Sequence, residues 1–266
     1  MESNINISNE TYDIPAVINV PETNAGVFPA VILCHGTASQ KNEVGDLFVK
    51  FGDELAGAGI ASIRFDFAGC GDSRAEQTDL TFYGEVSDTE KVYEYLVDHE
   101  SIDSDRIGIL GFSQGARVMA EFLGDHTDSI KAAVSLSGAC HNGKGVFRGW
   151  FERYEDELEE KGYATIPMGW REDLILPAKW FDDVKKSNPM DELSKYEGSI
   201  LAVSGTDDEL VPYRHVHEII DMCSKAEIRD LKIIKDADHI FNCLDAERSK
   251  AEYVLDSVSS WINRHI

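Results

Sequence analysis

The chain has 266 residues, of which 42% are hydrophobic and 28% charged, which is typical of one globular domain with an insertion and excludes a disordered or repetitive protein. Its 25 basic and 49 acidic residues give a formal net charge of −24. A surface of that sign repels phosphate backbones and anionic lipids, so we expect neither nucleic acid nor a membrane as a partner.

The N-terminal segment is polar and acidic. Residues 1–6 lack the basic and apolar regions of a secretory signal, so we expect a cytoplasmic protein unless a signal peptide has been removed. No apolar stretch reaches the roughly 18 residues that span a bilayer. The first twenty-odd residues predict one or two antiparallel edge strands.

Short apolar runs alternate with longer amphipathic segments along the rest of the chain. The runs are typical of strands covered by helices on both faces, and they lie at residues 30–34, 60–65, 107–110, 132–136, 200–203 and 231–234. The amphipathic segments predict helices, near residues 43–58, 85–99, 115–124, 213–225 and 247–264. The alternation predicts a doubly wound α/β fold with a mostly parallel sheet.

One stretch, residues 139–197, interrupts this alternation because it contains no convincing strand of the sheet. A structureless loop of that length would be unusual in a compact domain. We therefore expect a partly helical lid inserted into an α/β core that consists of residues 1–138 and 198–266.

The predicted lid is rich in aromatic residues. We expect most of them to pack the lid against the core, and a few to line an apolar substrate pocket. The candidates for pocket residues are Trp150, Trp170, Trp180 and, at the start of the lid, His141.

The segment Gly111-Phe112-Ser113-Gln114-Gly115 joins a predicted strand to a predicted helix. Such a turn holds a serine on a sharp bend, and its flanking glycines avoid clashes. Ser113 would lie at a helix N-terminus, where developing negative charge is stabilised. This context predicts a nucleophilic serine, and an ordinary glycine-rich turn is the alternative.

A serine hydroxyl needs a base to take its proton, and the base needs an orienting carboxylate. In this strand-turn-helix arrangement the chain order is serine, acid, histidine. His239 follows the last predicted strand, where a loop returns over Ser113, and we predict it as the base. His215 and His217 fall in a predicted helix and are expected at the surface, and no carboxylate-bearing loop pairs with His141.

The acid is expected in the loop at residues 204–212, after the preceding strand. Asp207, Asp208 and Glu209 compete there, and the residues alone do not choose between the two aspartates. The spare acids can cap the helix that begins near Pro212.

A tetrahedral oxyanion requires two backbone N–H donors. One is expected from Gln114, directly after the serine, and the other from Thr37, in the loop after the strand at residues 30–34. We interpret His35 as a residue that shapes this loop.

The five cysteines are odd in number and scattered, without a Cys-x-x-Cys pair. This pattern predicts neither a disulfide framework nor a zinc site. We expect no metal and no cofactor, and we leave open a homodimer.

Several motifs occur in an order that resembles the bacterial cinnamoyl (feruloyl) esterases of the α/β-hydrolase superfamily. The segments that carry the resemblance are His35-Gly36-Thr37, Arg64-Phe65-Asp66-Phe67-Ala68-Gly69-Cys70-Gly71-Asp72-Ser73, Gly111-Phe112-Ser113-Gln114-Gly115, Gly205-Thr206-Asp207-Asp208-Glu209-Leu210-Val211-Pro212 and Asp238-His239-Ile240-Phe241. The chain departs from the pattern at Phe112, where the family commonly has histidine, and at Ala116, where it has glycine.

The resemblance implies that Asp208 is the triad acid and that an inserted lid helps to hold a hydroxycinnamoyl ring. It further implies hydrolysis of small ferulate, caffeate or coumarate esters without a cofactor. The lid offers no residue-by-residue match. A thioesterase, acyltransferase or peptidase on the same fold is the alternative enzyme, and a non-catalytic binding protein is the alternative outside enzymes.

Overall fold

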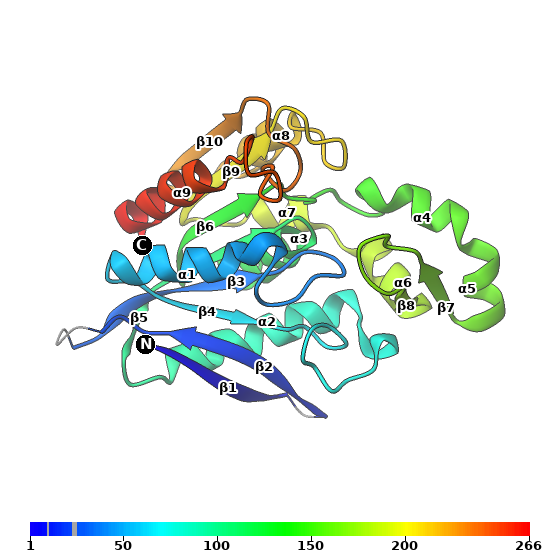
Figure 1. Ribbon diagram of the computed structural model, residues 1–266, viewed down its shortest axis with the longest axis horizontal. Coiled ribbons are helices and arrows are strands. Elements are labelled where there is room, and N and C mark those ends of the chain that lie inside the picture. The colour runs from blue at the N-terminus through cyan, green and yellow to red at the C-terminus, as the bar shows by residue number, and fades with distance from the viewer. Residues whose placement is uncertain (10, 23–25) are drawn as a thin grey trace.

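A computed structural model of the protein describes residues 1–9, 11–22 and 26–266. Its central sheet has eight strands in the order β1-β2-β4-β3-β5-β6-β9-β10. Only the pairs β1–β2 and β2–β4 are antiparallel; the other pairs are parallel, which confirms the predicted fold class (Figure 1). The strands are β1 (Glu2–Asn9), β2 (Tyr12–Asn19), β3 (Phe28–Cys34), β4 (Ala61–Phe65), β5 (Ile102–Phe112), β6 (Ile130–Leu136), β9 (Ser199–Gly205) and β10 (Arg229–Ile234).

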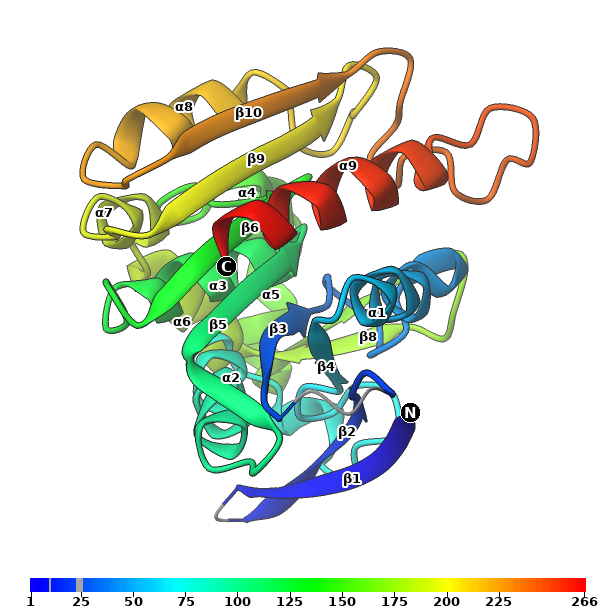
Figure 2. The ribbon, with the colours of Figure 1, turned by 90° about the vertical axis from the view of Figure 1, so that its left-hand side faces the viewer.

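Helices cover both faces of this sheet (Figure 2). One face carries α1 (Leu47–Gly57) and α9 (Ala251–His265), and the other carries α2 (Phe82–Val97), α3 (Gln114–Leu123) and α8 (His215–Met222). Short 3-10 helices are η1 (Val44–Asp46), η2 (Gln77–Asp79) and η3 (Gly145–Phe147). Within the described ranges, no helix combines the length and apolarity needed to cross a membrane.

The apolar core is divided by the sheet. Along β3, Val31 and Leu33 belong to the cluster under α1 and α9, whereas Ile32 and Cys34 belong to the cluster under α2 and α3. This alternation follows from the two-residue period of a strand, and it explains why the run is apolar throughout.

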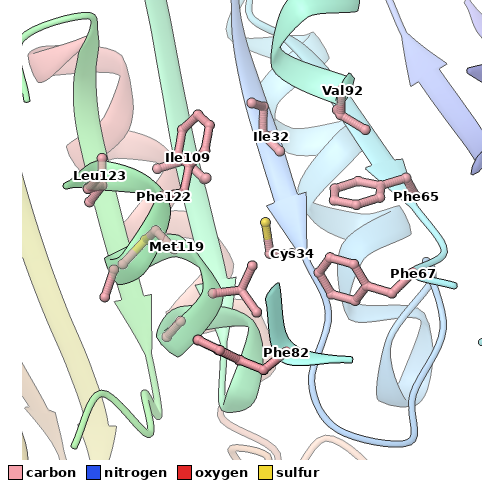
Figure 3. Packing of buried hydrophobic residues seen from close by; sticks show 14 of the residues in the cluster. Ile32, Cys34, Phe65, Phe67, Phe82, Val92, Ile109, Met119, Phe122 and Leu123 are labelled. Carbon is pink, nitrogen blue, oxygen red and sulfur yellow. The ribbon is translucent and has the colours of Figure 1, made fainter. Parts of the chain in front are cut away.

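The packing between β3, β5 and α3 fixes the turn that precedes α3. Figure 3 shows Met119 and Phe122 of α3 beside Ile109 of β5, with Ile32 of β3 close by. All four side chains are at most 2% exposed. Burying each contributes roughly 1.5–3 kcal/mol, so α3 is held firmly against the strand that leads into it.

Most of the segment at residues 139–197 lies beyond the carboxyl ends of the sheet strands (Figure 1), while its last helix packs against α3. Its two strands form a separate antiparallel hairpin. Its elements are α4 (Arg148–Arg153), α5 (Glu155–Lys161), β7 (Tyr163–Ile166), β8 (Leu174–Pro177), α6 (Ala178–Lys186) and α7 (Pro189–Leu193).

A buried arginine of α3 ties this segment to the core. Arg117 is 0% exposed, and its guanidinium donates to the carbonyl of Gly143, to the carbonyl of Val184 at 3.1 Å and to the hydroxyl of Ser187 at 2.7 Å. All three acceptors belong to residues 139–197. Because a buried charge is costly without partners, Arg117 requires these loops to stay in place.

Candidate active site

Ser113 lies on the turn between β5 and α3, with φ 53° and ψ −115°. A residue other than glycine adopts such a backbone only where its surroundings enforce it. A Cβ on Gly111 would lie 2.4 Å from Cα of Ala116, and one on Gly115 would lie 2.0 Å from the carbonyl oxygen of Cys34. Both glycines are therefore needed for the strand, turn and helix to approach so closely.

His239 lies directly over the serine. Its Nε2 is 3.0 Å from Oγ of Ser113, and its Nδ1 is 2.9 Å from Oδ2 of Asp208. An ionised carboxylate can only accept a hydrogen bond, so Nδ1 carries the imidazole proton and Nε2 is free to accept one. This arrangement can remove the proton from the serine hydroxyl.

Asp208, not Asp207, is the aspartate that pairs with His239. Its side chain is 0% exposed, and its second oxygen accepts the backbone N–H groups of Leu210 at 3.0 Å and Val211 at 2.8 Å. Asp207 is exposed and instead accepts the hydroxyl of Thr206. Of the two aspartates that the loop sequence left open, Asp208 is therefore the one in contact with His239.

The loop that carries His239 is held by several polar contacts. Ser137 donates its hydroxyl to the carbonyl of His239 at 2.9 Å. Oδ1 of Asp238 accepts the N–H groups of Ile240 at 3.0 Å and Asn242 at 2.7 Å. These bonds fix the backbone on both sides of the imidazole, so its position does not depend on the Asp208 contact alone.

The amides of Thr37 and Gln114 are available as donors. Gln114 is the first residue of α3, directly after Ser113, and Thr37 follows the carboxyl end of β3 beside it. Neither backbone N–H has an acceptor in the part of the chain that the structure describes. Both can therefore donate to a developing oxyanion.

The loop of Thr37 is shaped by two buried side chains. His35 accepts the N–H of Phe67 on Nε2 at 3.3 Å, and its Nδ1 donates to the carbonyl of Gly36 at 2.9 Å. Burial lowers the pKa of His35, so the ring is neutral and holds the loop as we interpreted it. Glu43 accepts the N–H of Gly36 at 2.6 Å; this role was missed, since an isolated glutamate in a sequence gives no sign of it.

A cavity of about 840 Å³ opens over Ser113 and His239. Its walls are largely apolar, and they include the side chains of Val146, Phe147, Trp150, Met168, Trp170 and Leu244. Its charged side chains are Glu43, Arg171 and Glu172. Arg171 also donates to the carbonyl of Ala38 at 2.8 Å, which joins the β7–β8 hairpin to the loop of Thr37.

The predicted pocket residues of the lid divide into two groups. Trp150 and Trp170 line the cavity, and Trp170 is 65% exposed at its rim. Trp180 does not line it, contrary to expectation: it is 1% exposed and packs against Phe147 and Phe181, with ring centroids 5.2 Å away in each case. The reason is that α6 turns its apolar stripe toward the core, and Trp180 lies on that stripe.

His141 also lies outside the cavity lining. Its ring stacks on that of His215, with centroids 3.5 Å apart and an interplanar angle of 7°. His215 is only 2% exposed, so the expectation of a surface position was wrong for it and right for the exposed His217. The helix period predicts a buried face for α8. His215 lies on that face, where the ring of His141 covers it.

A buried carboxyl of α2 lies behind the turn. Glu85 accepts from the side-chain amide of Gln114 at 3.2 Å, and the indole of Trp180 is close enough to lower its pKa slightly. Burial raises the pKa of Glu85 to about 8. The group is therefore largely protonated at neutral pH, and it connects the serine turn to the segment that carries Trp180. Sequence reasoning missed it, since a glutamate in an amphipathic helix is typical of an exposed face.

Comparisons with known proteins agree with this architecture. A family model described as alpha/beta hydrolase fold matches residues 29–160. An uncharacterised 31.7 kDa protein of the traX-finO intergenic region of Escherichia coli is 35% identical over 102 residues, which is 38% of this chain and 34% of that protein. The chain thus matches only about a third of the length of these curated relatives.

Solved structures match over nearly the whole length. Est1E from Butyrivibrio proteoclasticus, in a structure with ferulic acid bound, has a TM-score of 0.77 at 21% identity and covers 98% of each chain. A dienelactone hydrolase from Anabaena variabilis has a TM-score of 0.68 at 15% identity, covering 100% of this chain and 98% of that one. The chain therefore has the α/β-hydrolase fold, and its structure resembles that of Est1E.

Proposed function

We propose that the protein is a serine carboxylesterase in which Ser113 is the nucleophile, His239 the general base and Asp208 the residue that orients it. One observation carries the proposal: a continuous hydrogen-bonded chain of 3.0 Å and 2.9 Å links the three side chains at the wall of the cavity. Distances of this length are those required of a nucleophile and its base.

The reaction follows from the positions of these groups. Nε2 of His239 takes the hydroxyl proton as Oγ of Ser113 attacks the ester carbonyl carbon. The carbonyl oxygen becomes an oxyanion that the amides of Thr37 and Gln114 stabilise, and losing one such donor typically costs about 3–4 kcal/mol of transition-state stabilisation. Nε2 then returns the proton to the leaving alcohol, and water hydrolyses the acyl-enzyme by the same steps.

We further propose that the acyl group is a hydroxycinnamoyl group and that residues 139–197 act as the lid over it. The cavity has aromatic walls at Phe147 and Trp150, against which a planar ring can stack. The motifs shared with cinnamoyl esterases and the likeness to Est1E, which was solved with ferulic acid, support the same substrate class. The cytoplasmic location and the homodimer stay predictions.

The test is a substrate panel with matched serine variants. Purified protein is assayed on methyl ferulate, caffeate and coumarate, on p-nitrophenyl acetate and butyrate, on an acyl-CoA thioester and on a short peptide. We expect the highest kcat/KM for the hydroxycinnamates. Higher values for the thioester or the peptide would replace the substrate proposal by the alternative acyl hydrolase.

The same assay distinguishes activity lost with the nucleophile from activity lost through unfolding. Ser113→Ala should lower kcat by a factor on the order of 10⁶, as in comparable triads. The control is Ser104→Ala, an exposed serine of the same strand β5, which should leave kcat unchanged. Ester hydrolysis by Ser113→Ala near the wild-type rate would refute the catalytic proposal.

A further inference from the structure

The mouth of the cavity over Ser113 has an exposed apolar rim. Among the large hydrophobic side chains after Met1 that the structure describes, the three most exposed are those of Trp170, Leu210 and Leu244, at 65%, 66% and 70%. All three line this one cavity. Single exposed apolar residues are common on a protein surface, but a group of them around one opening is typical of a binding site.

Much of this rim belongs to the two loops that carry Asp208 and His239. Five residues of these loops line the cavity, and they are Leu210, Val211, His239, Ile240 and Leu244. Both loops lie wholly within the described residues 26–266, and among the five only the histidine has a side chain that forms hydrogen bonds. This side of the cavity therefore offers a ligand apolar surface and one imidazole.

The proposed mechanism places the alcohol part of an ester on this side. Nε2 of His239 returns the proton to the leaving alcohol, so the alcohol oxygen must come within about 2.6–3.2 Å of that nitrogen. The acyl part extends from the reacting carbon in another direction, and Phe147 and Trp150 provide the aromatic wall proposed for it. The carbon chain of the alcohol therefore begins beside His239 and continues along the two loops.

The charged side chains of the cavity lie outside these two loops. Glu43 uses both carboxylate oxygens to accept backbone N–H groups. Arg171 donates to the carbonyl of Ala38 at 2.8 Å, and Glu172 follows it in the turn between β7 and β8. An alcohol with several free hydroxyl groups thus finds few side-chain partners where its chain would lie.

The cavity is also larger than a methyl hydroxycinnamate requires. Its volume is about 840 Å³, toward the upper end of the range of about 300–1,000 Å³ for sites that hold drug-sized ligands. A methyl hydroxycinnamate is smaller than such a ligand. Space therefore remains for an alcohol of several carbons, and Leu210 and Leu244 extend that space at the mouth.

We infer that the protein prefers esters of apolar aliphatic alcohols and that Leu210 and Leu244 bind the alcohol chain. This inference rests on the proposed esterase function, but it does not depend on the hydroxycinnamoyl group. An apolar chain gains free energy by leaving water for this surface. The hydroxyls of a polyol or sugar would lose water there without a replacing hydrogen bond.

The experiment measures kcat/KM for esters that differ only in the alcohol. One series is methyl, propyl and glyceryl ferulate, and the other is methyl, propyl and glyceryl butyrate. Propyl and glyceryl esters have the same carbon chain and differ by two hydroxyls. We expect kcat/KM to rise about two- to fourfold per carbon from methyl to propyl, and to be at least about tenfold higher for propyl than for glyceryl esters. Each series forms a single acyl-enzyme, so these differences report on the alcohol.

Two variants test whether the rim is the cause of the preference. Leu210→Ser and Leu244→Asn replace exposed side chains, so both should fold. Each should lower the propyl-to-glyceryl ratio of kcat/KM at least about threefold. The control is Leu231→Asn, at an exposed position of β10 outside the cavity lining, which should keep the wild-type ratio. Because a ratio is compared, the fraction of active protein in each preparation cancels.

The outcomes separate this inference from the esterase proposal. A kcat/KM for the glyceryl ester that equals or exceeds that for the propyl ester, in any series that is hydrolysed, would overturn the inference alone. Unchanged ratios in both leucine variants would also overturn it, and if these variants then convert a dimer into a monomer, the rim binds a second copy of the chain. Hydrolysis of butyrates without ferulates would refute only the hydroxycinnamoyl group, and the butyrate ratio would still decide. No hydrolysis in either series would refute the esterase proposal and this inference together.

Discussion

The loops at the carboxyl edge of the sheet and the proposed lid at residues 139–197 position their side chains in different ways. Ser113, Asp208 and His239 each follow a strand, β5, β9 and β10, so the register of the parallel sheet brings them together. In residues 139–197, Trp180 is buried on α6, whereas Trp170 is exposed in the connection between β7 and β8. The proposed chemistry thus depends on the sheet, while the shape of the proposed substrate cavity depends on how residues 139–197 pack against the core.

The two regions are nevertheless connected behind the serine. Arg117 of α3 donates to three acceptors in residues 139–197. Glu85 of α2 accepts a hydrogen bond from Gln114 of the serine turn, and its pKa is also influenced by the indole of Trp180. Variants on each side of this connection can therefore test whether chemistry and cavity shape are separable.

The largest effect should come from the aspartate on the sheet side. Asp208→Asn keeps the size of the side chain but no longer favours the Nδ1–H form of His239, and in a comparable triad such a change lowers kcat about 10⁴-fold. Asp207→Asn, at the adjacent exposed position, should retain nearly full kcat. Steady-state hydrolysis of p-nitrophenyl butyrate distinguishes them, and the reverse ranking would assign the role to Asp207.

In residues 139–197, replacing the two tryptophans should lower the free energy of unfolding by different amounts. Trp180→Ala removes a ring that is 1% exposed and should lower the free energy of unfolding by about 3–5 kcal/mol. Trp170→Ala removes one that is 65% exposed and should change it by about 0.5 kcal/mol or less. Urea denaturation measures both, and equal losses would show that the lid packs differently.

The connection at Glu85 should be visible in the pH dependence of stability. Burial raises its pKa from 4.5 to about 8, so the folded state keeps a proton that the unfolded state has lost. The stability this group contributes is full below pH 4.5 and is lost as pH rises toward about 8, by up to a few kcal/mol.

Glu85→Gln should abolish that part of the pH dependence. The fall in unfolding free energy between pH 5 and pH 9 should be smaller in this variant than in the wild type. The control is Glu54→Gln, at an exposed position of α1. Its free energy of unfolding should fall between pH 5 and pH 9 by as much as that of the wild type. If the free energy of unfolding of Glu85→Gln shows the same pH dependence as that of the wild type, burial does not keep the Glu85 carboxyl protonated.

The smallest effect is expected at the cavity wall. Trp150→Ala removes an aromatic surface beside the serine, which should raise KM for methyl ferulate about tenfold, the equivalent of roughly 1–1.5 kcal/mol of ring contact. KM for p-nitrophenyl acetate should change little, because its acetyl group has no ring to stack on that wall. A change in kcat with unchanged KM for ferulate would place Trp150 with the catalytic loops instead.

Much of the core could be predicted from the sequence because its signals are local. Apolar runs predicted the strands, and the glycines at 111 and 115 predicted a turn in which any Cβ would clash. The order of serine, acid and histidine then followed from the order of the strands. The choice of Asp208 over Asp207 could not follow from the residues, because adjacent side chains point in different directions and only the folded loop decides which faces His239.

The rest could not be predicted because it depends on contacts between distant segments. A helix period shows which face of α6 or α8 is apolar, but it does not show what covers that face, and so the pocket position expected for Trp180 and the surface position expected for His215 were wrong. Glu43 and Glu85 have the charge of surface residues. In the folded protein they are buried and accept hydrogen bonds from Gly36 and Gln114.

The most direct test of the central claim is active-site labelling with a fluorophosphonate, followed by peptide mapping. We predict one phosphonyl adduct per chain on Ser113, no adduct in Ser113→Ala and strongly slowed labelling in His239→Ala, because the probe reacts only with an activated serine. An adduct on another residue, or equal labelling rates in the wild type and His239→Ala, would contradict the account.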